Sequence, residues 1–160
     1  MKFKFLRYYF PIGLGVCIAL IIGGFILQEK LDWKLTITLI ASIISSIYFV
    51  EKQKLEQMEF FIKLFTECNR RYDSLNEKLN QILREDQQKE LSPDQIDLLY
   101  DYFNLCTEEY LFYKEGFIYP EVWRSWRNGM RVFFDNQRIK EIWLKEEKSG
   151  SYYGFRAPIR

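Results

Sequence analysis

The segment from Trp123 to Arg131 has the residue types that bind phosphates and stack on nucleobases. Arg124, Arg127 and Arg131 are three and four residues apart, so on a helix their guanidinium groups share one face. Guanidinium groups bind phosphate oxygens bidentately, and a neighbouring aromatic ring can stack on a base. We therefore expect a ligand-binding face here. The alternative is that the tryptophans are core and the arginines pair with acidic side chains or lipid headgroups.

The C-terminal tail offers further groups of the same kind. Tyr153 and Phe155 are aromatic, Gly154 between them is flexible, and Arg156 adds a cation. We expect Arg156 to contact the same ligand and the two rings to stack on its bases. The polar run at 69–71, which contains two arginines, is a third candidate.

The composition excludes several kinds of enzyme. The chain has no histidine, which removes Ser-His-Asp and Cys-His catalysis, HExxH zinc sites and a histidine general base. Its three cysteines lack CxxC spacing, and no glycine-rich phosphate loop occurs. Glu108 and Glu109 are adjacent acids, but neighbouring helix residues point to different faces. We expect no enzyme, no metal site and no cofactor.

Charge is unevenly distributed along the chain, although the net charge is only +1. Residues 91–115 contain six acids and one base, whereas residues 121–160 contain nine bases and five acids. Such regions can attract each other within one domain, or they can hold subunits together in an oligomer.

Two apolar stretches lie near the start of the chain, separated by a polar loop at 28–34. The first, 8–27, is uncharged and has the roughly 20 residues that a helix needs to cross a membrane. The second is uncharged over only 16 residues, 35–50, but residues at its ends can lie at the interfaces. We predict a transmembrane hairpin over 1–50, with spans at about 8–27 and 33–50. Lys and Arg flank both outer ends, which predicts that both termini are cytoplasmic.

Each predicted span carries a pattern on one helix face. Small residues, which allow close helix packing in lipid, recur in the first span at Gly15, Ala19 and Gly23. Hydroxyl groups form a polar stripe in the second span at Thr38, Ser42 and Ser45. The stripe can bond to a neighbouring helix or line a water path, and a pore would require an oligomer. Alternatively, the hydroxyls bond to carbonyls of their own helix.

The remaining chain shows helical patterns and no convincing strand. From 51 to about 86 there is no Pro or Gly, and apolar residues recur every seven positions, which predicts a helical stalk over 51–90. Asn69 and Asn76 on this seam favour a particular oligomer state; the alternative is a single amphipathic helix packed on its own domain.

A sensor domain is predicted for 91–160, together with the stalk. Local signals place helices after Ser92, from Pro120 and after Asn136, with ends near Gly116 and Gly150. The expected fold class is all-α: a two-helix transmembrane hairpin, a long stalk helix and a small cytosolic helical domain.

The predicted layout resembles the membrane effectors of bacterial antiphage defence, in particular the small type III CRISPR-associated effectors that sense cyclic tetra-adenylate. Within the helical domain the chain also resembles a module of small bacterial membrane-anchored proteins. The residues that carry this second resemblance are Tyr102-Phe103-Asn104-Leu105-Cys106, Glu108-Glu109-Tyr110, Tyr113-Lys114, Gly116, Trp123, Trp126 and Gly129-Met130.

The resemblance implies a multi-pass protein of the bacterial inner membrane that permeabilises or depolarises the membrane as a homo-oligomer. Its implied ligand is a cyclic oligoadenylate, with cyclic tetra-adenylate expected. The implied partners are the lipid bilayer and this ligand, and neither DNA nor long RNA is expected. The competing hypothesis is a membrane-anchored interaction or scaffold protein without ligand or conduction.

Overall fold

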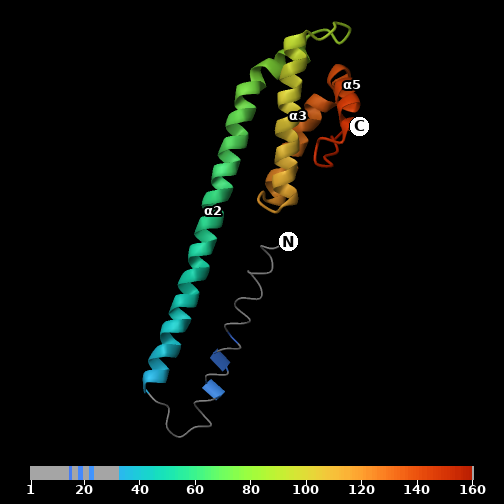
Figure 1. Cartoon of the computed structure of the whole chain (residues 1–160). Coiled ribbons are helices and arrows are strands. Elements are labelled where there is room, and N and C mark those ends of the chain that lie inside the picture. Colours follow the sequence, from blue (N-terminus) through green and yellow to red (C-terminus); the bar gives the residue numbers. More distant parts are fainter. Residues whose placement is uncertain (1–14, 16–17, 20–21, 24–32, 160) are drawn as a thin grey trace. The chain divides into compact units, whose positions relative to one another are not determined.

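The computed structural model describes residues 15, 18–19, 22–23 and 33–159 (Figure 1). These residues are helical or irregular, and none of them lies in a strand, so the predicted all-α fold class is confirmed. The elements, labelled as in Figure 1, are α2 (Trp33–Arg84), α3 (Pro93–Lys114), α4 (Pro120–Phe134), α5 (Gln137–Glu146) and the short 3-10 helix η1 (Glu147–Ser149).

The chain forms two compact units, Met1–Phe60 and Phe61–Arg160, whose border lies within α2. We call the second unit the helical domain. The predicted stalk is helical as far as Arg84, and residues 61–84 of it belong to the same compact unit as the helices that follow.

The prediction of a multi-pass inner-membrane protein is wrong. Within the described part of the chain, no helix combines the length and the apolar character needed to cross a membrane. The physical reason lies in α2, whose apolar part, 35–50, has 16 residues and is followed directly by Glu51 and Lys52. A spanning helix needs roughly 20 apolar residues. Most of the first predicted span, 8–27, lies outside the described residues.

Local sequence signals set both ends of α3, as predicted. Ser92 accepts a hydrogen bond from the backbone N–H of Gln95 at 3.3 Å, and the Gln95 side chain accepts one from the Ser92 N–H at 3.0 Å. This capping box satisfies two N–H groups that the first turn leaves open. At the other end Gly116 has φ +83°, and the Phe117 N–H donates to the Phe112 carbonyl at 2.8 Å. A left-handed glycine allows this reversal without a Cβ clash.

The starts of α4 and α5 were also predicted correctly. Pro120 is the first residue of α4, where its missing N–H costs nothing. Asn136 precedes α5 and accepts hydrogen bonds from the backbone N–H groups of Arg138 and Ile139. The turn between α4 and α5 is therefore only two residues long, which holds the two helices close together.

Aromatic rings form the centre of the helical domain. Four of its fully buried rings come from three helices and the C-terminal tail: Phe103 of α3, Phe134 of α4, Trp143 of α5 and Phe155 of the tail. The Trp143 centroid lies 5.1 Å from Phe103 and 5.4 Å from both Phe134 and Phe155. Edge-to-face ring pairs at such distances contribute about 0.5–1.5 kcal/mol beyond the burial of their area.

The second half of α2 packs against this core. Leu79 is fully buried, and Tyr72 packs on the core with its hydroxyl donating to Asn76 at 3.0 Å. The Asn76 side-chain oxygen also accepts from Asn80 at 2.7 Å, and Asn69 donates to a carbonyl of its own helix at 2.9 Å. Both seam asparagines are thus hydrogen-bonded within the chain, and their role in an oligomer stays a prediction.

One buried arginine closes the C-terminal end of α2. The Arg138 guanidinium of α5 donates to the Ile82 carbonyl, to the Lys89 carbonyl at 3.1 Å and to the Glu85 carboxylate at 3.3 Å. The Ile82 carbonyl is among the last four of α2, which have no partner within the helix. Hydrogen bonds from Gln95, Lys89 and Arg138 lower the pKa of Glu85. This contact joins α5 to the connection between α2 and α3.

We predict that Arg138→Met destabilises the helical domain by roughly 3 kcal/mol, because it leaves a buried carbonyl and part of a carboxylate without a donor. The free energy of unfolding in urea is the measurement. Lys145→Met, at an exposed position of α5, is the matched control and should unfold near the wild-type midpoint. Equal midpoints for the two variants would contradict the role of Arg138.

Candidate ligand-binding site

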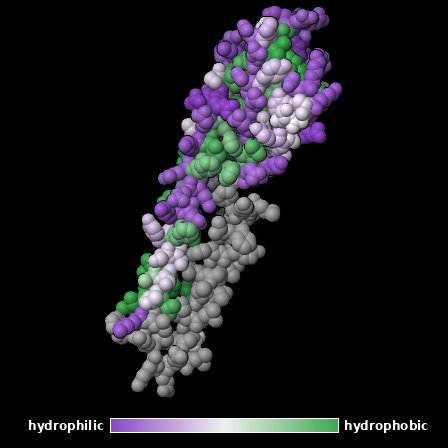
Figure 2. Space-filling view, viewed as in Figure 1, coloured by the Kyte–Doolittle hydropathy of each residue, from purple (hydrophilic) through white to green (hydrophobic). Residues whose placement is uncertain are grey.

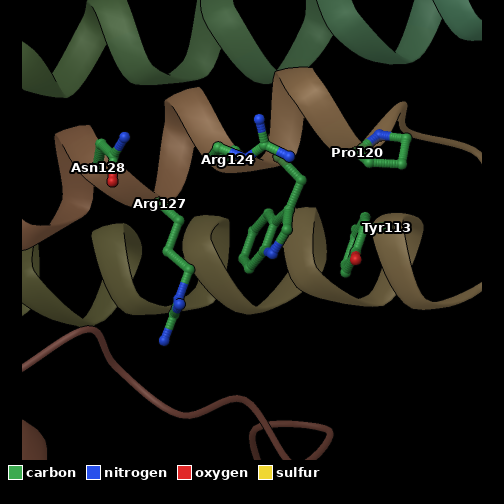
Figure 3. A pocket seen from close by; sticks show the side chains of 6 residues that line it. Tyr113, Pro120, Arg124, Arg127 and Asn128 are labelled. Atoms are coloured by element: carbon green, nitrogen blue, oxygen red, sulfur yellow. The ribbon is translucent and has the colours of Figure 1, made fainter.

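An open cavity of about 260 Å³ lies where the end of α3 meets α4 (Figure 3). One lining residue, Tyr113, comes from the last turn of α3, and the others belong to the first part of α4. The full lining is Tyr113, Pro120, Trp123, Arg124, Arg127 and Asn128. Pro120, Arg124 and Asn128 are four residues apart, so the helix period places them on one side of α4.

Two stacked rings line the cavity. The ring centroids of Trp123 and Tyr113 are 5.2 Å apart with an angle of 13° between the planes. Trp123 is only 8% exposed and is supported from the core by Tyr110 at 5.8 Å and by Phe155 at 6.3 Å. These neighbours hold the indole in one orientation, so the cavity has a rigid aromatic wall.

Arg124 and Arg127 are exposed cations beside this wall. Among the described residues, neither they nor Arg131 forms an ion pair with a carboxylate. The alternative that these arginines pair with the acidic α3 is therefore not seen. Figure 3 shows the Arg127 side chain extending away from Arg124.

Other arginines have structural partners. Arg71 of α2 pairs with Glu108 of α3, and Arg70 pairs with Glu67 at 2.6 Å on the same helix. The third candidate site, at 69–71, is thus occupied by contacts within the chain.

The structure does not bring the tail residues to the cavity. Phe155 is 1% exposed and belongs to the core, so its prediction as a base-stacking ring is wrong in this structure. The tail turns back at Tyr153 and Gly154, which have φ of +51° and +79°, and this turn places the Phe155 ring inside. Tyr153 is 53% exposed, and Arg156 pairs with Glu147 at 3.2 Å. Neither lines the cavity, and nor does Arg131.

Sequence reasoning missed the wall of the cavity. Trp123 and Tyr113 are among the residues that carry the resemblance, but neither is predicted as a ligand-binding residue. Trp123 and Arg127 are four residues apart, so helix spacing alone could have grouped them. Tyr113 becomes a neighbour only through the packing of α3 on α4, which no local pattern reveals.

The hydroxyl stripe of α2 bonds mostly to its own helix. Thr38 donates to the Lys34 carbonyl at 2.9 Å, and Ser42 donates to the Thr38 carbonyl at 2.8 Å. Ser45 is exposed on the same helix. The backbone is helical at Gly15, Ala19 and Gly23, but most of their sequence neighbours lie outside the described residues. Helix packing or pore lining by either set stays a prediction.

The acid pair Glu108–Glu109 is divided between surface and core. Glu108 bonds to Arg71, whereas Glu109 is 6% exposed and lies near the buried thiols of Cys68 and Cys106. Burial raises the pKa of Glu109 to about 8, against a smaller opposing effect of Arg71. Burial also raises the pKa of the Cys68 thiol to about 12, so this cysteine stays protonated and poorly nucleophilic.

The described residues contain no cluster of His, Cys, Asp or Glu that could hold a metal ion.

We predict that Glu109 makes the domain less stable as the pH rises. Its pKa is about 8 in the folded chain and 4.5 as the reference value, so the unfolded chain loses this proton first. Stability should fall between these pH values, by on the order of 4 kcal/mol, and level off above them. Urea unfolding from pH 5 to 9 should show Glu109→Gln gaining stability relative to wild type as pH rises. Glu115→Gln, an exposed control, should follow the wild type. If the stabilities of Glu109→Gln and wild type change in parallel with pH, the raised pKa of Glu109 is contradicted.

Comparison with protein-family models, with curated proteins and with solved structures gives no match. The fold and the cavity therefore rest on the residues of this chain alone, and the resemblance to antiphage effectors stays a prediction.

Proposed function

We propose that the helical domain binds a phosphate-bearing nucleotide ligand at the α3–α4 cavity. The observation that carries the proposal is the combination of two exposed arginines that lack an acidic partner with the stacked rings of Trp123 and Tyr113. Cations that are not neutralised by the protein are available to phosphate oxygens, and an aromatic wall favours a nucleobase.

The size of the cavity limits what one chain can hold. At about 260 Å³ it is slightly smaller than the ~300–1,000 Å³ typical of pockets for drug-sized molecules. One copy therefore accommodates about one nucleotide unit. A ligand with several identical units would be shared between several copies, and each copy would read one unit.

A cyclic oligoadenylate fits this requirement, and cyclic tetra-adenylate is the form we propose from the resemblance to antiphage effectors. Its repeated phosphates and bases match one cavity per subunit in a symmetric homo-oligomer. The proposal is confined to ligand recognition in bacterial antiviral defence. Membrane permeabilisation is not part of it, because that expectation required membrane-spanning helices and none is found among the described residues.

We predict that calorimetric titration of the full-length chain with cyclic tetra-adenylate gives saturable binding, and that Arg124→Ala and Arg127→Ala each weaken it about tenfold or more. Loss of one charge-assisted phosphate contact corresponds to about 1.5–3 kcal/mol. Arg84→Ala removes an exposed arginine outside the cavity and should bind as the wild type does.

Titrations with other oligoadenylates test how specific the binding is. Cyclic di-, tri- and hexa-adenylate test ring size, and linear tetra-adenylate tests the need for a ring. If a folded chain binds none of these molecules, or if Arg84→Ala weakens binding as much as Arg127→Ala does, the proposed site is wrong. Absence of binding would favour the hypothesis of an interaction protein without ligand.

A further inference from the structure

An acidic stripe runs along the first half of α3. It consists of Asp94, Asp97 and Asp101, which are three and four residues apart and all exposed. Among the described residues, none of the three has a hydrogen bond or ion pair through its side chain. In Figure 2 hydrophilic residues cover most of the visible surface of the helical domain.

The arginine stripe of α4 has the same spacing. Arg124, Arg127 and Arg131 are also three and four residues apart, and they also lack a partner in the described part of the chain. Each stripe spans eight residues of helix, and its first and last members are about 10 Å apart along the axis. Arg124 and Arg127 are exposed and Arg131 is half-buried, so a helix that carries the acidic stripe can approach at least two of these cations with its carboxylates.

The two stripes do not neutralise each other within one chain. Helices α3 and α4 pack together, but the acids that pair with arginines are Glu67, Glu85, Glu108 and Glu147. The stripes therefore remain open to an external partner. The whole chain has 23 basic and 22 acidic residues, so two copies do not repel each other through net charge.

We propose that the acidic stripe of one copy docks on the arginine stripe of a second copy. Such an interface is heterologous, because it uses a different surface on each partner, and each docked pair leaves one stripe of each sign free. Assembly can therefore continue into a ring or a chain. Exposed ion pairs are individually weak and screened by salt, so the association should be reversible and sensitive to ionic strength.

The inference does not depend on the proposed ligand. Charge complementarity between the stripes holds even if the chain binds no nucleotide. Because Arg124 and Arg127 belong to both surfaces, a bound phosphate ligand and a docked acidic stripe would exclude each other.

We predict that the full-length chain associates at low salt in the absence of nucleotide, as measured by sedimentation velocity. Reversing the acidic stripe with Asp97→Arg and Asp101→Arg should weaken association about tenfold or more. Reversing the arginine stripe with Arg124→Glu and Arg127→Glu should do the same. An equimolar mixture of the two variants should associate again, because each carries the stripe that the other needs.

A matched control reverses two acids elsewhere. Asp73→Arg and Glu77→Arg change the same net charge on exposed positions of α2 and should associate as the wild type does. Circular dichroism establishes that each variant is folded. The proposal is overturned if the wild type is monomeric at low salt, if neither stripe reversal weakens association, or if the mixture of folded variants does not restore it.

Discussion

The contact of Trp143 with Phe103, Phe134 and Phe155 is the constraint on which the helical domain depends. These rings come from α5, α3, α4 and the tail, so their packing fixes four segments that are short or poorly stable in isolation. Phe155 then contacts Trp123, which stacks on Tyr113 in the candidate site. The orientation of the cavity wall thus follows from core packing. Arg127 lies on the same side of α4 as Trp123, four residues away, and Arg124 lies next to that side, so both exposed guanidinium groups border the buried face of the helix.

The arginines divide into two groups according to their surroundings. Arg138 is 8% exposed and satisfies the end of α2, and Arg71 joins α2 to α3 through Glu108. A guanidinium with such partners contributes to the fold and is unavailable to a ligand. Arg124 and Arg127 have neither burial nor a carboxylate to explain them. Arg84 is also exposed and forms no ion pair with another described residue, so Arg124 and Arg127 differ from it by their position beside the rings of Trp123 and Tyr113.

Sequence reasoning worked where the signal is local. The capping box at Ser92, the prolines at the first positions of α3 and α4, Gly116 and Asn136 act within a few residues, and each predicted helix boundary was close to the observed one. It failed where the role of a residue depends on contacts with segments that are distant in the sequence. The turn at Tyr153 and Gly154 directs Phe155 into a core that is formed by distant helices, and Tyr113 meets Trp123 only after α3 and α4 have packed. The hairpin prediction accepted the 16 uncharged residues at 35–50 as a span by assigning the residues at their ends to the membrane interfaces, and no described helix is long and apolar enough to cross a membrane.

The shared arginines have a thermodynamic consequence for the two proposals. If one surface binds either a phosphate ligand or an acidic stripe, each binding event reduces the affinity for the other by the same factor. Ligand would then shift the population from stripe-docked copies toward copies whose cavities hold ligand, and the size of the shift is set by the difference in affinity between the two states. No movement of the core is required for this coupling. The rigid ring cluster can hold α3 and α4 in place while the exposed arginines of α4 exchange one anionic partner for another.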